Sequence, residues 1–313
     1  MPVVTELPLP SANSAPASPP PPQASPRDLL LFHSLWGFEG SLEAALVRAR
    51  ARGFDGLELN LRHPVLLERP LADAADHLRQ AKLALVLELV TGGDYVPDLA
   101  CGVDDHLAEL EQQLEACPGL APLKVTVITG SDSWSWREQE RFWPRAIALA
   151  EASGLAVSFE THRSRSLANP WAMADWLAAF PGLRLTADLS HWCVVAERLM
   201  TPELAPIQAM AAHVDHIHAR IGHAQAPQVN HPFAPEHHQA LAAHLACWKW
   251  FAASQANRQA QHSGDQQPRP LTLTPEFGPD GYLPTLPFTN QPVADLLEIN
   301  TAMAAWLRQE LGS

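Results

Sequence analysis

Four polar side chains that can bind a metal ion each follow a short apolar segment. They are Glu160, Asp188, His218 and Glu276, separated by 28, 30 and 58 residues (188−160, 218−188 and 276−218). A carboxylate buried alone after an apolar segment loses its hydration, so three of them beside an imidazole suggest a shared positive charge. Three carboxylates and one neutral imidazole form a mostly oxygen site, which suits Mn²⁺ first, with Mg²⁺, Co²⁺ or Zn²⁺ as alternatives. We therefore expect these residues to hold one divalent metal ion.

Each of the four residues also has a structural interpretation without a metal. A lone Glu or Asp at a strand end is most often a helix cap or a solvated loop residue, and Asp188 is placed to cap a helix. His218 is one of 15 histidines and fits a hydrogen-bonded core residue, while Glu276 lies among turn-forming residues. The metal hypothesis therefore depends on all four lying at equivalent strand ends.

Eight short apolar segments alternate with helical patterns and must position these side chains. Segments such as LALVLELV and LKVTVIT are almost continuously apolar, as in strands that are covered on both faces, which favours a parallel sheet. The predicted strands are Leu29–Leu35, Gly56–Leu61, Leu83–Thr91, Leu123–Thr129, Leu155–Thr161, Leu183–Leu189, His216–Ile221 and Leu271–Phe277.

Helix-capping residues mark the segments between the predicted strands. Ser41 can cap a helix over 41–53, and Asn169, followed by Pro170, can cap one over 169–182. Thr201 is predicted to cap a third helix over 201–210 in the same way. Pro144 lies inside the helix predicted before the fifth strand, where it implies a kink or a break.

Eight strand–helix units are enough to close an α/β (β/α)₈ barrel, and residues 27–313 are long enough for a single domain of this kind. A doubly wound open sheet is the alternative fold. It usually carries a GxGxxG turn after its first strand, and SLWGFEGS does not match that pattern. In a barrel the carboxyl ends of the strands face the active site, so Glu160, Asp188, His218 and Glu276 are expected at one opening.

Composition restricts the partners and the setting of the chain. With 47% apolar and 18% charged residues it can bury a large core, and its net charge of −13 makes nucleic acid an unfavourable partner. The sequence contains no run of about eighteen apolar residues, so no membrane span is predicted. Four cysteines without a CxxC pair are typical of reduced thiols, which favours the cytoplasm. Residues 1–26 contain nine prolines and are predicted to be a disordered tail, with a proline-binding partner as the alternative.

The segments FETH, ADLSH, HIHAR and TPEFG resemble the xylose isomerase-like TIM-barrel superfamily, in particular its sugar phosphate isomerase/epimerase-like branch. The likeness extends from about Leu29 to Leu311. It implies a mononuclear metal site and a proton-transferring pair, Glu160 and Glu276. It further implies that His191 and Arg220 hold oxygens of the substrate.

Further polar residues are expected to form the walls of the pocket. His162, two residues after Glu160, and His223 are predicted to bind substrate. The loop after the seventh strand is interpreted as a lid containing His223, Gln225, Gln228 and His231, with a second metal site or a plain surface loop as alternatives. The early strands offer His33, Trp36, Glu58 and Asn60 as further wall residues.

Aromatic residues and one cysteine also lie near the predicted site in the sequence. In the loop after Glu276, Tyr282 and Phe288 either shape the pocket or cover the rim. Cys193 is expected to be a packing thiol. One pocket residue is expected among six tryptophans, namely Trp134, Trp136, Trp143, Trp192, Trp248 and Trp250.

The function predicted from these features is a divalent-metal-dependent isomerase or epimerase. It would act on a sugar or a small polyhydroxylated carbonyl compound by removing an α-proton and forming an enediolate. A metal-dependent dehydratase of inosose or dehydroshikimate type and a non-catalytic ligand-binding barrel are the alternatives. The apurinic-site endonucleases of the superfamily are disfavoured, because the third and fourth predicted strands lack the extra histidines that a three-zinc site needs. A homo-oligomer is also compatible with the resemblance.

Overall fold

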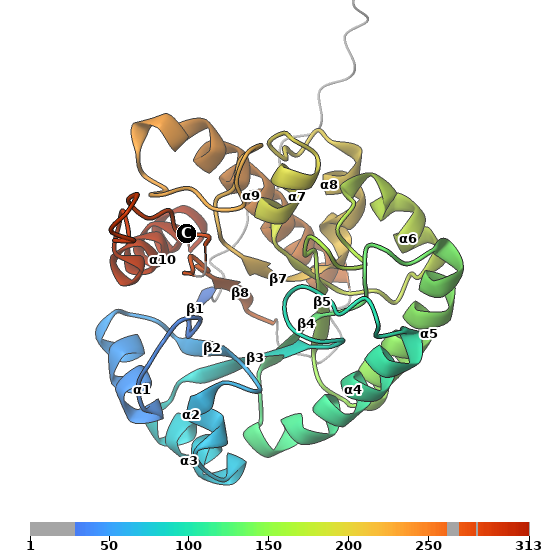
Figure 1. Ribbon diagram of the computed structural model, residues 1–313, viewed down its shortest axis with the longest axis horizontal. Helices are drawn as coiled ribbons and strands as arrows, with labels where there is room; N and C mark the ends of the chain where they lie inside the picture. Colours follow the sequence, from blue (N-terminus) through green and yellow to red (C-terminus); the bar gives the residue numbers. More distant parts are fainter. Residues whose placement is uncertain (1–28, 262–268, 280, 313) are drawn as a thin grey trace, which may run out of the picture.

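Eight parallel strands close into a barrel in the order in which they occur along the chain (Figure 1). The computed structural model describes residues 29–261, 269–279 and 281–312, and the predicted Pro-rich tail lies outside them. The strands are β1 Leu29–Ser34, β2 Gly56–Asn60, β3 Ala84–Val90, β4 Lys124–Ile128, β5 Val157–Glu160, β6 Leu185–Ala187, β7 Val214–His218 and β8 Leu271–Thr274. Pairing of β1 with β8 closes the ring, which confirms the predicted (β/α)₈ barrel.

Helices surround the barrel on its outside (Figure 1). They are α1 Leu42–Ala51, α2 Pro64–Leu67, α3 Leu71–Ala81, α4 Val103–Ala116, α5 Trp136–Ala152, α6 Met173–Ala179, α7 Leu189–Val195, α8 Ala205–Met210, α9 His238–Gln261 and α10 Leu296–Leu311. Short 3₁₀ segments are η1 Cys117–Leu120, η2 Pro170–Ala172, η3 Ala211–His213 and η4 Pro235–His237. No helix among the described residues is long and apolar enough to cross a membrane.

The predicted helix starts are confirmed where a side chain can cap the helix. The Ser41 hydroxyl accepts the Ala44 N–H at 3.3 Å before α1, and the Asn169 carbonyl oxygen accepts the Trp171 N–H at 3.0 Å before η2 and α6. The Thr201 prediction is wrong, because residues 201–204 form a turn and α8 begins only at Ala205. α5 continues through Pro144, so the predicted break is also absent.

Every predicted strand is present, but the ends of several strands differ. β7 begins at Val214, two residues before the predicted start, and its pairing with β6 contains a register shift between Leu185 and Thr186. β8 ends at Thr274, so Glu276 lies just past the strand. The polar residues at these ends face the barrel opening instead of continuing the sheet.

Successive side chains of each strand point alternately toward the helices and into the barrel, and the two sides are packed differently. Leu29 and Leu31 of β1 belong to the apolar layer between the strands and the helices. The barrel interior is polar by contrast: the Thr126 hydroxyl of β4 donates to Thr186 Oγ1 of β6 at 2.8 Å, and Ser158 Oγ of β5 lies 2.7 Å from the same atom. Apolar packing outside the strands therefore stabilises the barrel and leaves its interior free for polar side chains.

Candidate metal centre

Glu160, Asp188, His218 and Glu276 converge at one end of the barrel. Each offers one ligand atom, and these four atoms all lie within 4.8 Å of one another. Glu160 and His218 end β5 and β7, Asp188 follows β6, and Glu276 follows β8. All four are buried, with the side chains of Asp188 and His218 fully inaccessible. The sequence prediction that these residues meet therefore agrees with the geometry.

We call these four residues the quartet. Two of their buried polar atoms lack hydrogen-bond partners among the described residues, which indicates that a cation can bind there. His218 Nδ1 lies 3.1 Å from Glu276 Oε2 and 3.5 Å from Glu160 Oε2. Among the described residues, neither His218 Nδ1 nor Glu160 Oε2 has a hydrogen-bond partner, although both atoms are buried. Such atoms are costly unless something binds them, and a divalent cation would satisfy both at once.

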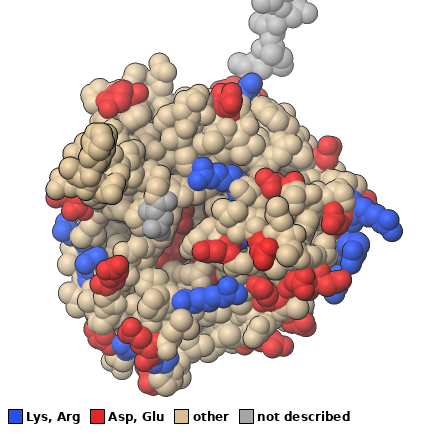
Figure 2. Space-filling model, in the orientation of Figure 1, with Lys and Arg blue, Asp and Glu red and all other residues tan. Residues whose placement is uncertain are grey.

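The electrostatics of the quartet lead to the same conclusion. Burial and the nearby Glu276 carboxylate raise the pKa of Glu160, against the opposing effect of His218. Burial also raises the pKa of Asp188, opposed by Arg220. Burial disfavours a charged His218, but the surrounding carboxylates outweigh that effect and raise its pKa well above the ordinary value. The site thus contains more negative charge than its own residues neutralise. A hollow opens over the barrel on the face in Figure 2, with acidic atoms at its bottom.

Arg220 is held against the quartet by several contacts. Its Nη2 donates to Asp188 Oδ2 and to His191 Nε2, the latter at 2.8 Å. Its Nε donates to Ser190 Oγ at 3.0 Å, and its Nη1 lies 3.4 Å from Glu276 Oε2. Arg220 therefore neutralises carboxylates of the site in addition to any role toward a substrate.

His162 and His191 lie beside Glu160 at the same opening. Their ring centroids are 4.0 Å apart, and His191 Nε2 is 3.8 Å from Glu160 Oε1. Burial lowers the pKa of both imidazoles well below the ordinary value, so both are neutral. His191 Nδ1 is buried without a hydrogen-bond partner among the described residues. Since Nε2 accepts from Arg220, Nδ1 carries the proton and can donate to a bound oxygen.

Aromatic rings cover one side of the site. The Arg220 guanidinium carbon lies 4.8 Å from the ring centroid of Tyr282 and 5.7 Å from that of Trp36. Tyr282 packs edge-on against Trp36, and Tyr95 stacks on Trp36 with ring centroids 6.2 Å apart. The Tyr282 and Trp36 hypotheses thus agree with the structure. Phe288 is 104% exposed and contributes nothing to this wall.

Several other predicted wall residues lie elsewhere. His33 points into the helix layer, where it stacks on Phe54 at 5.0 Å. Burial, with a smaller effect of Arg48, lowers the pKa of His33 to about 4. The six tryptophans in which one pocket residue was expected make packing contacts. Trp143, Trp192 and Trp248 are fully buried, Trp134 packs on His106 and Phe142, Trp136 stacks on Phe180, and Trp250 packs against the core. Trp36, which was predicted separately as a wall residue, contacts Arg220.

The loop after β7 is anchored to the site by Gln228 alone among its predicted lid residues. The Gln228 amide donates to Gly278 O at 3.1 Å and accepts Gly278 N–H at 2.9 Å. His223 stacks on His237 with ring centroids 5.8 Å apart, and its other contacts are with Gln225 and Ala226 of the same loop. The described residues of this loop hold no group of three metal-binding side chains, so the second-metal alternative gains no support.

The backbone after Glu276 is fixed from both sides. The Asn300 amide on α10 accepts Phe277 N–H at 3.0 Å and donates to Phe277 O at 2.9 Å. Gln228 holds Gly278 in the same way, and Arg220 Nη1 donates to Glu276 O at 3.4 Å. Glu276 therefore projects from a rigid segment even though it lies outside the strand.

The sequence analysis did not identify Glu88 of β3 as a buried carboxyl group of the barrel. Its Oε1 accepts from Asn60 Nδ2 and from the Tyr95 hydroxyl, both at 2.9 Å. Burial, followed by the Glu276 and Glu160 charges, raises its pKa to about 8. The signal that could have found it is a single carboxylate within the apolar segment LALVLELV.

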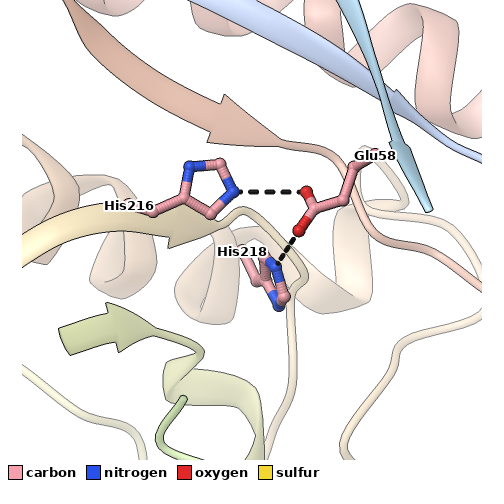
Figure 3. A group of neighbouring side chains, drawn as sticks. All are labelled: Glu58, His216 and His218. Carbon is pink, nitrogen blue, oxygen red and sulfur yellow. Dashed lines mark hydrogen bonds and ion pairs between the residues drawn. The ribbon is translucent and has the colours of Figure 1, made fainter. Parts of the chain in front are cut away.

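A second group missed from the sequence joins β2 to β7. Glu58 contacts both His216 and His218 inside the barrel (Figure 3). The spacing of these histidines by two residues places them on one face of a strand, which is the signal that could have found them. Glu58 was expected as a wall residue of the pocket, but its contacts with the two histidines were not predicted.

Similarity to known proteins is found in the structure alone, since neither a protein-family model nor a curated protein matches the sequence. An L-ribulose 3-epimerase has a TM-score of 0.59 at 15% identity, covering 90% of this chain and 94% of the other. The probable 3-DHS dehydratase AsbF from Bacillus anthracis has a TM-score of 0.55 at 15% identity, with coverages of 90% and 98%. A xylose isomerase-like TIM barrel protein from Mycobacterium smegmatis, in complex with magnesium, has a TM-score of 0.60 at 11% identity, with coverages of 90% and 96%. The chain therefore has the fold of the xylose isomerase-like TIM barrels.

Proposed function

We propose that this protein is a divalent-metal-dependent isomerase or epimerase that acts on a sugar or a small polyhydroxylated carbonyl compound. The observation that carries the proposal is the convergence of Glu160, Asp188, His218 and Glu276, with two buried atoms left unpartnered. Similarity to an epimerase, and to a barrel that binds magnesium, supports it. Mn²⁺ is the ion we propose first, because carboxylate oxygens dominate the donor set; Mg²⁺, Co²⁺ and Zn²⁺ are alternatives.

The bound ion would polarise a substrate carbonyl and favour an enediolate when the neighbouring C–H loses its proton. Glu160 and Glu276 come from β5 and from the segment after β8, so they approach the site from different sides. One glutamate would accept the α-proton and the other would return a proton to the opposite face, which inverts the carbon. Return of the proton to the adjacent carbon would give isomerisation.

The remaining side chains would orient the substrate and exclude water. His191 presents a free Nδ1–H, and His162 lies beside it, so both can contact hydroxyl oxygens. Arg220 keeps the carboxylates in place and can contact a substrate oxygen at the same opening. Trp36 and Tyr282 would cover an apolar face of the substrate. We also propose that His223 contacts the substrate, which would require the loop after β7 to close over the site.

The experiment is solvent deuterium exchange at the carbon next to the carbonyl. Purified protein with added Mn²⁺ would be incubated in D₂O with L-ribulose, D-allulose, D-fructose and an inosose. Incorporation of deuterium that EDTA abolishes and Mn²⁺ restores supports the proposal. No incorporation into any of these compounds by the metal-loaded protein contradicts it.

A dehydratase is the second candidate, because the chain is also similar to a probable 3-DHS dehydratase. The same α-proton would leave, and a β-hydroxyl would then depart as water. The ultraviolet absorbance of an enone in the same incubations identifies this reaction. A protein that binds no divalent ion would instead favour the non-catalytic barrel. The cysteines at 101, 117, 193 and 247 are free thiols, which supports our proposal of a reducing, cytoplasmic setting.

A further inference from the structure

Glu58 contacts two histidines of β7 across the interior of the barrel (Figure 3). Its Oε1 lies 3.0 Å from His218 Nε2 and its Oε2 lies 3.2 Å from His216 Nε2. The Thr274 hydroxyl of β8 also donates to Glu58 Oε2. Glu58 is 3% exposed, and His216 and His218 are no more than 1% exposed. Three strands thus meet at one buried carboxylate.

The protons of this cluster can be assigned from its chemistry. Oε1 of Glu58 faces His218 Nε2, and Oε2 faces His216 Nε2 and accepts the Thr274 hydroxyl. An ionised carboxylate can only accept hydrogen bonds, so both imidazoles must donate from Nε2. His216 Nδ1 can then accept from the Thr272 hydroxyl, whose Oγ1 lies 2.8 Å away. Every polar atom of Glu58 and both Nε2 atoms have a partner.

The consequence for His218 concerns its other ring nitrogen. With the proton on Nε2, a neutral His218 has a lone pair on Nδ1, which points away from Glu58 (Figure 3). That atom faces Glu276 and Glu160 and has no hydrogen-bond partner among the described residues. A metal-binding histidine commonly donates its second N–H to a carboxylate, which fixes the ring and makes the ligating nitrogen more basic.

We infer that Glu58 is a positioning residue: it holds His218 in the tautomer whose Nδ1 can bind the divalent ion of the quartet. This inference rests on the proposed function, since it assumes a metal at the quartet. His216 and Thr274 in turn hold Glu58, so the network reaches from the metal ligand to three strands. Glu58, His216 and His218 also qualify by distance as a metal site of their own. Their complete hydrogen bonding argues against that alternative, because the unpartnered atoms lie on the quartet side of His218.

The test compares Mn²⁺ affinity in the full-length wild type, Glu58→Gln and Glu88→Gln. Each substitution removes a carboxyl group from a buried glutamate inside the barrel, but only Glu58 contacts an imidazole. Electron paramagnetic resonance of free Mn²⁺ gives the dissociation constants. Loss of an outer carboxylate partner weakens metal binding about 10–100-fold, so Glu58→Gln should bind at least about tenfold more weakly than Glu88→Gln. Equal affinities in the two variants would overturn the inference.

A measurement on the wild type does not depend on the folding of Glu58→Gln. In ¹⁵N-histidine-labelled protein loaded with Zn²⁺, nuclear magnetic resonance should show His218 protonated at Nε2 and bound to the ion through Nδ1. A protonated Nδ1 would overturn the inference. Two ions per wild-type chain and one per Glu58→Gln chain would assign the cluster as a second metal site instead. If the wild type binds no divalent ion, the proposed function itself fails, which is distinct from equal affinities in the two variants.

Discussion

Asp188 divides its two carboxylate oxygens between a helix and Arg220. Oδ1 accepts the Ser190 N–H at 2.8 Å and so caps α7, while Oδ2 accepts a hydrogen bond from Arg220 Nη2. The cap and the site therefore use different atoms of one side chain. Because Ser190 also accepts from Arg220 Nε, the start of α7 and the guanidinium hold each other in place. Arg220 is thus part of the charge balance of the site before any substrate arrives.

Replacing Arg220 with alanine should destabilise the metal-free protein. The substitution leaves Asp188 and Glu276 as buried carboxylates without their guanidinium, and removing one partner of a buried ion pair costs about 3–5 kcal/mol. Saturating Mn²⁺ should restore part of that loss, because the ion supplies positive charge to the same carboxylates. Urea unfolding with EDTA and with Mn²⁺ measures both effects. Arg220→Lys is the matched control, and an unchanged free energy of unfolding in Arg220→Ala would contradict the assigned role.

Replacing Glu276 with glutamine should stop proton transfer while the barrel stays folded. The backbone after this residue is held by Asn300 and Gln228, neither of which contacts the Glu276 carboxyl. Loss of a proton-transferring group typically lowers the rate about 10²–10⁴-fold. Deuterium exchange measures the rate, and circular dichroism checks the fold. Exposed Glu298→Gln on α10 is the control, and wild-type exchange by Glu276→Gln would exclude the role.

Local patterns in the sequence were sufficient to predict the barrel and the quartet. Apolar segments predict the strands, and each of the four polar residues lies at the end of a strand or at most two residues past it, so the topology brings them together. Glu58 could not be paired in advance, because His216 and His218 lie 158 and 160 residues further along the chain. Its partners depend on how β2 faces β7 in the closed ring, and the sequence carries no local signal for that.

Glu88→Gln should change how the stability of the metal-free protein depends on pH. Burial, followed by the Glu276 and Glu160 charges, raises the pKa of Glu88 in the folded state to about 8, whereas the ordinary value for the solvent-exposed carboxyl of the unfolded chain is 4.5. Between those values the folded state binds more protons than the unfolded state, so the wild type loses stability as pH rises through this window. Glutamine is always neutral and can still accept from Asn60 and Tyr95. The free energy of unfolding of the variant should therefore rise relative to that of the wild type between pH 5 and pH 8, by an amount on the order of 3 kcal/mol.

The measurement for Glu88 is urea unfolding in EDTA at several pH values. Exposed Glu298→Gln serves as the control for general effects of pH on a carboxyl-to-amide change. A stability difference between Glu88→Gln and wild type that is the same at pH 5 and pH 8 would show that Glu88 keeps an ordinary pKa.

Asn300→Ala should weaken both the fold and the metal site, although Asn300 lies on α10 and contacts no quartet side chain in the described structure. The substitution leaves the buried N–H and C=O of Phe277 without partners, and each unsatisfied group costs about 1–3 kcal/mol. Glu276 precedes Phe277, so its carboxylate should also lose its fixed position, and Mn²⁺ should bind more weakly. Asn300→Asp keeps an acceptor for the Phe277 N–H but places a buried carboxylate oxygen against the Phe277 carbonyl oxygen, so it should also destabilise the fold. Unfolding in EDTA and Mn²⁺ titration separate the two effects. A variant that is less stable yet binds Mn²⁺ with wild-type affinity would show that the clamp supports the fold alone.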